Sequence, residues 1–331
     1  MPSRRYDIVT VGAATRDVFL PVGEQWIRRT RSGRELVFPL GDKIDVGNLI
    51  FETGGGATNT AVGFTRLGFR TAFVGRIGSH DTRGHAIVET LKHEGVDTSL
   101  VIRDPRRMTA YSLIMLTPKG ERTIFVQRGA SAEFRVNEIP FSRMQANWWY
   151  ITSLSGNMPV LRALIGQARQ RGIHIALNPG AGELSQGWAK LMPLLRHVDI
   201  TFVNDEEART LAGPRGKTDE HAFRALCWNL PGLVVVTRGS RGASVCDAER
   251  QYISQTHRIA LVNTTGAGDA FGCGFLAGYI KSEGDIVRSL QSATANSESV
   301  IQHLGAKAGL LNRFPSPANA ARVIVHRFPT Q

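Results

Sequence analysis

The most constraining feature of this 331-residue chain is a regular alternation of short apolar runs and helical segments past residue 145. The apolar runs are typical of buried strands and read WWYITSL (148–154), IHIALNPG (173–180), DITFVND (199–205) and LVVVTRG (233–239). Helical segments are predicted near 159–171, 184–196, 205–212 and 219–229. Short buried strands that alternate with helices form a parallel sheet covered on both faces. The expected fold class is therefore α/β, with a mostly parallel central sheet flanked by helices.

The first half of the chain is less regular. YDIVTVG at 6–12 predicts a buried first strand, and a polar, irregular stretch is expected from there to about residue 36. A helix is predicted to begin at Gly56 and to end at Gly68, since its apolar residues share one helical face. A second helix and a hairpin with the turn TPKGE are predicted further along, at 82–94 and 110–129.

The domain organisation follows from these patterns. No internal repeat, low-complexity segment or long linker divides residues 1–331. The segments at about 19–54 and 108–128 are interpreted as a small lid of β-strands on that single domain. Parallel sheets bind ligands outside the carboxyl ends of their strands, where the polar and glycine-rich tips of this chain fall.

Composition limits the class of partner. Hydrophobic residues make up 42% and charged residues 21%, which is typical of an ordinary globular protein. The net charge of +12 suits a nucleic acid or an anionic small molecule such as a nucleotide. The densest basic cluster, RRTRSGR at 28–34, has no interleaved aromatic residues. We therefore expect a solvated face or a lid there, a small-molecule substrate, and no nucleic-acid partner.

The cysteines and the hydrophobic runs bear on location. Cys227, Cys246 and Cys273 are odd in number and far apart in sequence. They predict neither a disulfide framework nor a metal site, and they favour a reducing cytoplasm. No apolar run approaches the ~20 residues that a membrane-spanning helix needs.

A glycine-rich bend before an apolar helix is the strongest chemical signal. VNTTGAGDAFGCGFLAGYIK at 262–281 contains Gly266, Gly268 and Asp269, although glycine costs about 1 kcal/mol against alanine inside a helix. The N–H groups of such a bend point outward at the positive end of the helix dipole, which suits a phosphate. A carboxylate beside them can accept a hydroxyl proton while charge grows on a phosphoryl group. The alternative for Asp269, a favourable charge at a helix N-terminus, leaves the glycines unexplained.

NTTGAGDAF resembles the second signature of the ribokinase-type (PfkB) carbohydrate kinases, usually written D-T-x-G-A-G-D. Further segments resemble motifs of that family in the same order: GGGATNTA (54–61), GRIGSHDTRG (75–84), NDEEA (204–208) and VVVTRGSRGA (234–243). Together the five span nearly the whole chain. The resemblance implies a ribokinase-like fold and ATP-dependent phosphorylation of an alcohol, expected to be a primary one, on a small sugar or nucleoside.

Carried over by position, the resemblance assigns roles in phosphate transfer. Asp269 would be the catalytic base, and the amides of Gly266, Ala267 and Gly268 would form the anion hole. Glu207 would bind Mg²⁺ through water, which agrees with the preference of this hard cation for oxygen ligands. The ATP-binding residues would be Asn204, Thr237, Arg238, Gly239, Gly242 and Asn296.

Plainer alternatives stay open for three of these residues. Asn204 can be a cap of the next helix, as can its neighbour Asp205. Arg238 can be a surface arginine, and Asn296 can be an exposed residue of a helix.

The substrate side is assigned in the same way. Asp17 would accept hydrogen bonds from sugar hydroxyls, and Asn59 with the backbone of Gly55 and Gly56 would add further bonds. The alternatives are a turn residue at Asp17 and a helix-start residue at Asn59.

Two departures from the family pattern limit what it implies. The first Asp of D-T-x-G-A-G-D, which often helps to hold a monovalent cation, is Asn263 here, so K⁺ activation is in doubt although backbone carbonyls can still bind K⁺. Ribokinase usually has G-G-K-G-x-N, whereas Gly56 occupies the lysine position here, which argues against ribose and sugar phosphates. A homodimer through lid strands is a further expectation from the family, and a non-catalytic nucleotide or sugar sensor is the alternative from another class.

Overall fold

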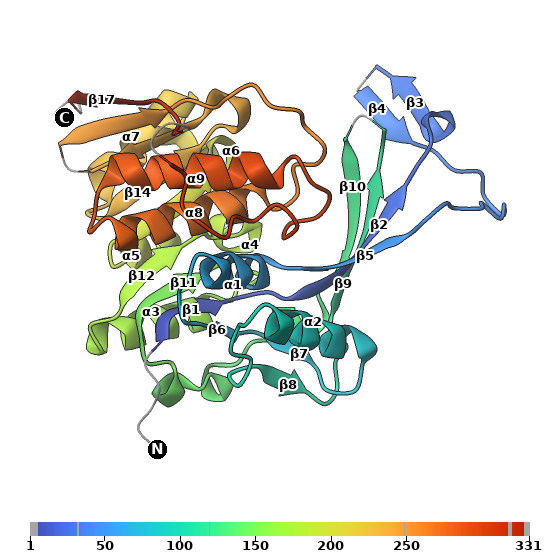
Figure 1. Ribbon diagram of the computed structural model, residues 1–331, viewed down its shortest axis with the longest axis horizontal. Coiled ribbons are helices and arrows are strands. Elements are labelled where there is room, and N and C mark those ends of the chain that lie inside the picture. The colour runs from blue at the N-terminus through green and yellow to red at the C-terminus, as the bar shows by residue number, and fades with distance from the viewer. Residues whose placement is uncertain (1–5, 32, 119, 248, 317–319, 328–331) are drawn as a thin grey trace.

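A nine-stranded sheet is the frame of the molecule (Figure 1), whose computed structural model describes residues 6–31, 33–118, 120–247, 249–316 and 320–327. The strand order is β17-β16-β15-β14-β13-β12-β11-β1-β6. The strands from β6 to β14 pair in parallel, and β15, β16 and β17 continue the sheet antiparallel. The bounds are β1 Tyr6–Val11, β6 Thr71–Val74, β11 Ala146–Ile151, β12 His174–Leu177, β13 Ile200–Asn204, β14 Leu233–Thr237, β15 Ala243–Cys246, β16 Arg250–Ser254 and β17 Val323–Arg327.

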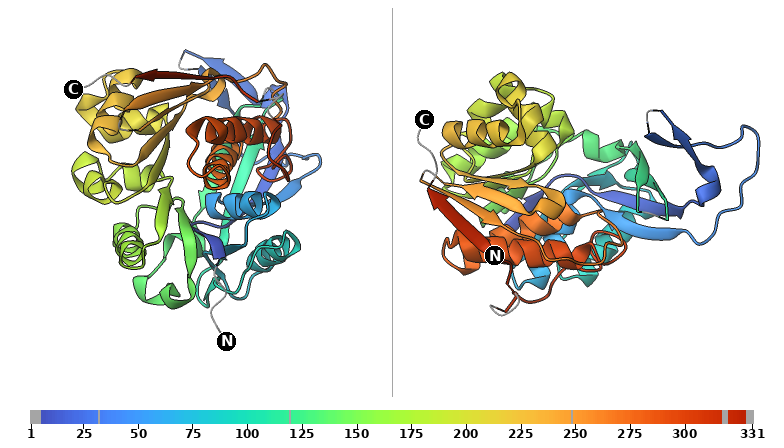
Figure 2. Two further views of the ribbon diagram at one scale, coloured as in Figure 1. Left: turned by 60° about the vertical axis from the view of Figure 1, so that its left-hand side comes forward. Right: turned by 90° about the horizontal axis from the view of Figure 1, so that it is seen from above.

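Helices cover both faces of this sheet, as the left view of Figure 2 shows. Neighbouring residues of β1 point to opposite faces: Val9 packs in a core that includes α3, α5, α6 and α7, and Ile8 in a core that includes α8 and α9. The expected α/β class with a mostly parallel sheet is confirmed. Within the described part of the chain no helix is long and apolar enough to cross a membrane. The bounds are α1 Gly56–Arg66, α2 Thr82–His93, α3 Met158–Gln170, α4 Ala181–Leu184, α5 Trp188–Leu195, α6 Asp205–Ala212, α7 Asp219–Asn229, α8 Ala267–Lys281 and α9 Ile286–Val300.

A four-stranded sheet of order β10-β9-β2-β5 extends away from this body (Figure 1), and we call it the lid sheet. It is built from β2 (Thr15–Pro21), β5 (Ile50–Gly54), β9 (Ala110–Leu116) and β10 (Arg122–Gln127). Smaller pairs are formed by β3 (Ile27–Thr30) with β4 (Gly33–Leu36) and by β7 (Arg76–Gly78) with β8 (Ile102–Asp104).

The expectation of an irregular stretch between the first strand and residue 36 is wrong, because β2, β3 and β4 lie there. The polar residues Thr15, Arg16 and Asp17 concealed β2, which pairs parallel with β9 and antiparallel with β5. The hairpin predicted at 110–129 is confirmed by the antiparallel pairing of β9 and β10.

Much of the lid sheet is open to solvent. The edge strand β10 is exposed along its whole length, and the Phe125 side chain is 57% exposed. At the far end, Arg28 and Arg29 of β3 are exposed as well. An unpaired apolar edge of this kind is a surface on which another strand can pair.

The expectation that no disulfide forms is wrong. Cys227 and Cys246 are joined by a disulfide across a Cα–Cα distance of 6.1 Å. The sequence concealed this pair because packing of α7 against the sheet brings its Cys227 next to Cys246 of β15, while Cys273 remains a buried free thiol. The cysteines therefore no longer argue for a reducing compartment.

Candidate active site

The glycine bend is built as the sequence predicts, at the start of α8. Gly266 has a left-handed φ of +79°, and a Cβ there would lie 2.4 Å from the Cβ of Ala306, so only glycine fits. Gly268 differs, since nothing lies within 4 Å of the position that its Cβ would occupy. The bend is therefore packed on one side and open at Gly268, where a ligand can approach the backbone amides.

Asp269 follows in the first turn of α8 and meets the start of α1. The Nδ2 of Asn59 donates to Oδ2 of Asp269 at 2.8 Å. A Cβ on Gly56 would lie 3.0 Å from Oδ1 of Asp269, so the two helix starts approach closely. Burial raises the pKa of Asp269 and the charge of Asp17 adds to this, whereas the Asn59 hydrogen bond and the charge of Lys307 lower it. The carboxyl group is thus poised to exchange a proton at a pH above the ordinary range of aspartate.

Asp17 lies buried on β2 beside this pair. Its Oδ1 accepts from Thr15 Oγ1 at 2.7 Å, and a Cβ on Gly54 would lie 1.9 Å from its Oδ2. Gly55 has φ +98°, and its Cβ would meet the carbonyl oxygen of Ala13 at 2.3 Å. The lid sheet and α1 therefore bring the predicted substrate residues Asp17, Gly55, Gly56 and Asn59 to one place next to Asp269.

Lys307 is the functional candidate that sequence reasoning missed. It follows α9, is 5% exposed, and donates to Oδ1 of Asn59 at 2.5 Å and to Oγ1 of Thr58 at 3.1 Å, with a third bond to the carbonyl oxygen of Thr53. Burial lowers its pKa to about 8, although nearby carboxylates including Asp17 oppose that shift. A single lysine among small residues in HLGAKAG (303–309) was the available signal. We call the buried Asp17, Asn59 and Lys307, together with the half-buried Asp269, the buried polar cluster.

On the other side of the glycine bend lies a cavity of about 760 Å³, which we call the open cavity. Its lining includes three residues that the resemblance assigns to ATP, namely Thr237, Gly239 and Gly242. Ala267 and Gly268 of the glycine bend line it as well. The conformation at Gly242 requires glycine, since φ is +88° and a Cβ would lie 1.9 Å from the carbonyl oxygen of Ser254. Lining residues that the sequence analysis did not identify are Ser240, Thr256, His257, Arg258, Ile259, Leu261, Thr264, Phe271, Thr294, Ser297, Glu298 and Ile301.

Three of the six residues assigned to ATP do not line this cavity: Asn204, Arg238 and Asn296. Asn296 is 1% exposed: its Nδ2 donates to the carbonyl oxygen of Ala270 at 2.8 Å, and its Oδ1 accepts from the amide of Leu311 at 2.9 Å. It ties α9 to α8 and is not the exposed helical residue considered as the alternative. In Thr294 the same helix provides a residue that does line the cavity.

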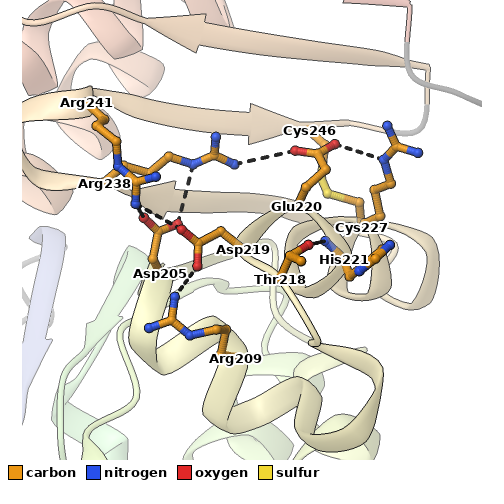
Figure 3. Close-up of polar contacts among 11 residues, drawn as sticks. Asp205, Arg209, Thr218, Asp219, Glu220, His221, Cys227, Arg238, Arg241 and Cys246 are labelled. Atoms are coloured by element: carbon orange, nitrogen blue, oxygen red, sulfur yellow. Dashed lines mark hydrogen bonds and ion pairs between the residues drawn. A yellow bond between two sulfur atoms is a disulfide. The ribbon is translucent and has the colours of Figure 1, made fainter.

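Arg238 does not line the cavity either, and Figure 3 shows its side chain beside Asp205 and Glu220. Its guanidinium pairs with Asp205 at 3.4 Å and with Glu220 at 3.9 Å, and it lies 5.5 Å from the centre of the Phe223 ring. Arg241 completes the group through Asp205 at 2.6 Å. The arginine is thus partly buried and paired rather than free to bind a phosphate.

Asn204 and Glu207 cap α6 reciprocally. Oδ1 of Asn204 accepts from the amide of Glu207 at 2.9 Å, and Oε2 of Glu207 accepts from the amide of Asn204 at 2.8 Å. The capping alternative therefore describes Asn204 in this structure. Burial raises the pKa of Glu207, and the charges of Glu206 and Asp269 raise it further. The charge of Asp269 therefore acts on Glu207.

The candidate active site offers few side chains that could bind a metal ion directly. No group of three or more His, Cys, Asp or Glu residues in the described ranges is arranged to hold a metal. At Asn263 the buried amide oxygen accepts from the amide of Thr265 at 2.8 Å, and its Nδ2 has no hydrogen-bond partner. An NH₂ group cannot ligate a cation. The Asn263 side chain therefore does not replace a carboxylate ligand for K⁺. A hydrated Mg²⁺ held by Glu207 and phosphate oxygens fits better.

The lid sheet touches the glycine motif directly. Arg122 of β10 hydrogen-bonds through its guanidinium to Oγ1 of Thr264, which lines the open cavity. The sequence analysis placed no residue of the hairpin at the site. The contact brings a positive charge from the lid to the junction of the cavity and the bend.

Comparison with known proteins agrees with this geometry. The model of the pfkB family carbohydrate kinases matches residues 8–313. An uncharacterized sugar kinase of Archaeoglobus fulgidus is 29% identical over 252 residues, which are 75% of this chain and 98% of that protein. A fructokinase of Escherichia coli is 30% identical over 248 residues, 70% of this chain and 78% of that protein.

Solved structures share the fold. The crystal structure of a probable sugar kinase from Rhizobium etli has a TM-score of 0.77, with 24% identity over 92% of this chain and 96% of that one. The crystal structure of adenosine kinase from Sinorhizobium meliloti has a TM-score of 0.76, with 23% identity over 93% of this chain and 98% of that one. At this identity the likeness concerns the fold alone, which is the ribokinase-like α/β fold expected above. Together with the match over residues 8–313, it shows that this chain belongs to the pfkB family of carbohydrate kinases.

Proposed function

We propose that the protein transfers the γ-phosphate of ATP to a primary hydroxyl of a small, uncharged sugar. The observation that carries the proposal is the position of Asp269 between two sites. On one side it meets Asn59 and Asp17 of the buried polar cluster, and on the other it adjoins the amides of Gly268 and the open cavity.

The proposed transfer uses each part of this arrangement. Asp17, Asn59 and the backbone of Gly55 and Gly56 bind sugar hydroxyls and direct one of them toward Asp269. The carboxylate of Asp269 accepts the hydroxyl proton, and the oxygen attacks the γ-phosphorus in line. The amides of Gly266, Ala267 and Gly268 stabilise the charge that develops on the transferred group.

ATP is proposed to occupy the open cavity, with Thr237, Gly239 and Gly242 beside it. Mg²⁺ would be held by Glu207 through water and would neutralise phosphate charge. Arg122 is placed to add a positive charge at the same phosphates. We do not expect K⁺ to be required, because Asn263 is an uncharged amide at the position of the family's first aspartate.

The lid sheet is proposed to close over the sugar and to exclude water, which would otherwise hydrolyse ATP. Its exposed strand β10, with Ile124, Phe125 and Val126 open to solvent, is proposed to pair with a second copy of the chain. A cytoplasmic location, where ATP is available, belongs to the same proposal.

A nucleoside is the second candidate substrate. It is favoured by the fold shared with an adenosine kinase, and a nucleoside offers ribose hydroxyls to the same cluster. A sensor without catalysis is disfavoured because Asp269 and Glu207 are both in place.

The test is a screen of ATP consumption with the full-length protein. The panel contains neutral ketoses and aldoses, sugar acids, sugar phosphates and nucleosides, each with and without K⁺. Turnover with a neutral sugar, and little effect of K⁺, is expected. Turnover with nucleosides alone would select the second candidate, and ATP binding without turnover on any acceptor would contradict the proposal.

A further inference from the structure

The ammonium of Lys307 is enclosed within the active site rather than displayed to a ligand. An ammonium has three N–H donors, and three acceptors surround this one: the carbonyl oxygen of Thr53, Oγ1 of Thr58 and Oδ1 of Asn59. No donor is left for a substrate oxygen. Lys307 therefore acts on the reaction through its neighbours.

The neighbour that matters is Asn59. An amide side chain can present either its oxygen or its NH₂ to a given partner, and the two look alike by shape alone. Here the choice is fixed, because an ammonium can only donate and so must face Oδ1. The NH₂ group then faces the opposite way, where it donates to Oδ2 of Asp269 at 2.8 Å. A rotated amide would set its oxygen against the carboxylate instead.

The charge of Lys307 also has a clear partner. The charges of Asp17, Glu52, Glu94 and Asp269 each raise the pKa of Lys307, whereas burial lowers it. At the resulting pKa of about 8, the lysine is charged at neutral pH. Like charges at one site raise the pKa of a carboxyl group, and an opposite charge lowers it. The groups that act on Asp269 or respond to its charge are Asn59 (α1), Asp17 (β2), Glu207 (α6), Tyr150 (β11), Cys273 (α8) and Lys307. Of these, Lys307 is the cation.

We propose that Lys307 is a positioning residue for phosphate transfer: it orients the Asn59 amide toward Asp269 and places a fixed positive charge beside this carboxylate. Oδ2 of Asp269 is thereby held by Asn59. Oδ1 accepts no hydrogen bond from the described part of the chain and is left for the acceptor hydroxyl. The inference rests on the proposed function, since it assumes that Asp269 accepts the proton. It adds a residue from the turn after α9 that lies outside the glycine motifs.

The first experiment measures kcat and KM for sugar and ATP across pH in the full-length protein and in Lys307→Met. We expect kcat at neutral pH to fall at least about tenfold, because an ill-placed or protonated base loses much of a general-base contribution. The acid limb of the kcat profile should move up by about one pH unit, because the carboxylate loses a neighbouring opposite charge. KM for ATP should not change. Unchanged kcat and an unmoved acid limb would overturn the inference.

Two variants separate the charge from the orientation. Lys307→Gln keeps a donor for Asn59 without the charge, so it should recover part of the lost kcat while the acid limb stays shifted. Lys281→Met is the matched control, because Lys281 is exposed in the last turn of the same helix as Asp269 and should behave as the unmodified protein. If Lys307 only supported the fold, the acid limb of the kcat profile would stay in place in all of these variants.

A double-mutant cycle tests whether Lys307 acts through Asn59. If it does, adding Lys307→Met to Asn59→Ala should lower kcat by a smaller factor than Lys307→Met does alone. Fully multiplicative losses would contradict the orientation part of the inference.

A measurement on the unmodified protein needs neither turnover nor a folded variant. The side-chain NH₂ protons of Asn59, observed by NMR, should exchange slowly with solvent because the amide is held at both ends. Fast exchange would overturn the inference whatever the variants show. Slow exchange together with no turnover on any acceptor would instead count against the proposed function and leave the Asn59 orientation supported.

Discussion

The buried polar cluster and the surroundings of the open cavity use charge in opposite ways. In the cluster, Asp17, Asp269 and Lys307 come from separate elements and converge on one point through Asn59. Arg238 and Arg241, which do not line the cavity, pair with Asp205 instead (Figure 3). The cavity wall is formed largely by glycines, hydroxyls and apolar side chains, and its charged or titratable lining residues are His257, Arg258 and Glu298.

This difference indicates how the two halves work. Backbone amides can hold phosphates without a charged side chain, because they carry partial charges fixed by the helix start and need no reorganisation. A hydroxyl, in contrast, must lose a proton, which requires a titratable group with a controlled pKa. Substitutions in the cluster should therefore affect catalysis, whereas substitutions of Arg238 and Arg241, which pair with Asp205, should mainly affect stability.

The largest effect is expected for Asp269→Asn. Removing the proton acceptor should lower kcat by about 10²- to 10⁴-fold, the usual range of a general base. ATP affinity, measured by calorimetry, should remain nearly intact because the bend and the cavity are unchanged. A variant with near-normal turnover would remove Asp269 from its role.

Asp17→Ala should come next. A hydrogen bond to a charged group contributes about 1.5–3 kcal/mol, so kcat/KM for the sugar should fall roughly 10- to 100-fold. KM for ATP should stay the same, as initial rates at varied ATP will show. Equal losses for sugar and ATP would mean that Asp17 holds the fold rather than the substrate.

The two glycines of the bend form a matched pair. Gly268→Ala should fold normally, since its Cβ meets no protein atom within 4 Å, and should weaken ATP use by about tenfold through contact with phosphate. Gly266→Ala should instead lower the free energy of unfolding by about 1–3 kcal/mol, because alanine is strained at φ +79°. Thermal melts and ATP kinetics on both variants distinguish these outcomes. Identical behaviour of the two would contradict the open face at Gly268.

The pH profile gives a further comparison. Because burial raises the pKa of both Asp269 and Glu207, each carboxylate takes up its proton at a higher pH than usual as the solution is acidified. Activity should thus be full above these pKa values and should be lost as pH falls through them, above the ordinary carboxylate range near pH 4. Activity retained down to about pH 4 would be inconsistent with a buried carboxylate base.

The smallest catalytic effect is expected for Arg238→Met. The loss of its ion pairs should reduce the free energy of unfolding by about 1–2 kcal/mol, while KM for ATP changes less than about threefold. Arg241→Met, at a side chain 63% exposed, should cost less stability. A large rise in KM for ATP in Arg238→Met, with stability unchanged, would show that Arg238 binds the phosphates.

The sequence predicted those features that depend on local pattern. Strands such as β14 follow from an apolar run, and the bend at Gly266 and Gly268 follows from residues that no helix would select. β2 was missed because three polar residues open it, and they are polar because the site lies there. The residues of β2 form a strand because they pair with β5 and β9, which are distant in sequence.

The remaining parts of the site depend on contacts between distant segments. Lys307 lies 248 residues from Asn59, and Cys227 pairs with Cys246 only because α7 packs on the sheet. Asn296 lies on the expected helix, but which face of α9 meets the cavity is decided by packing against α8. No local spacing reveals these three features.

The most direct test of the account is the structure of a complex with a non-hydrolysable ATP analogue, Mg²⁺ and the sugar selected by the screen. We predict that the terminal phosphate lies over the amide of Gly268 and that a carboxylate oxygen of Asp269 is within about 2.6–3.2 Å of a sugar hydroxyl. A terminal phosphate far from the bend, or a sugar hydroxyl out of reach of Asp269, would contradict it.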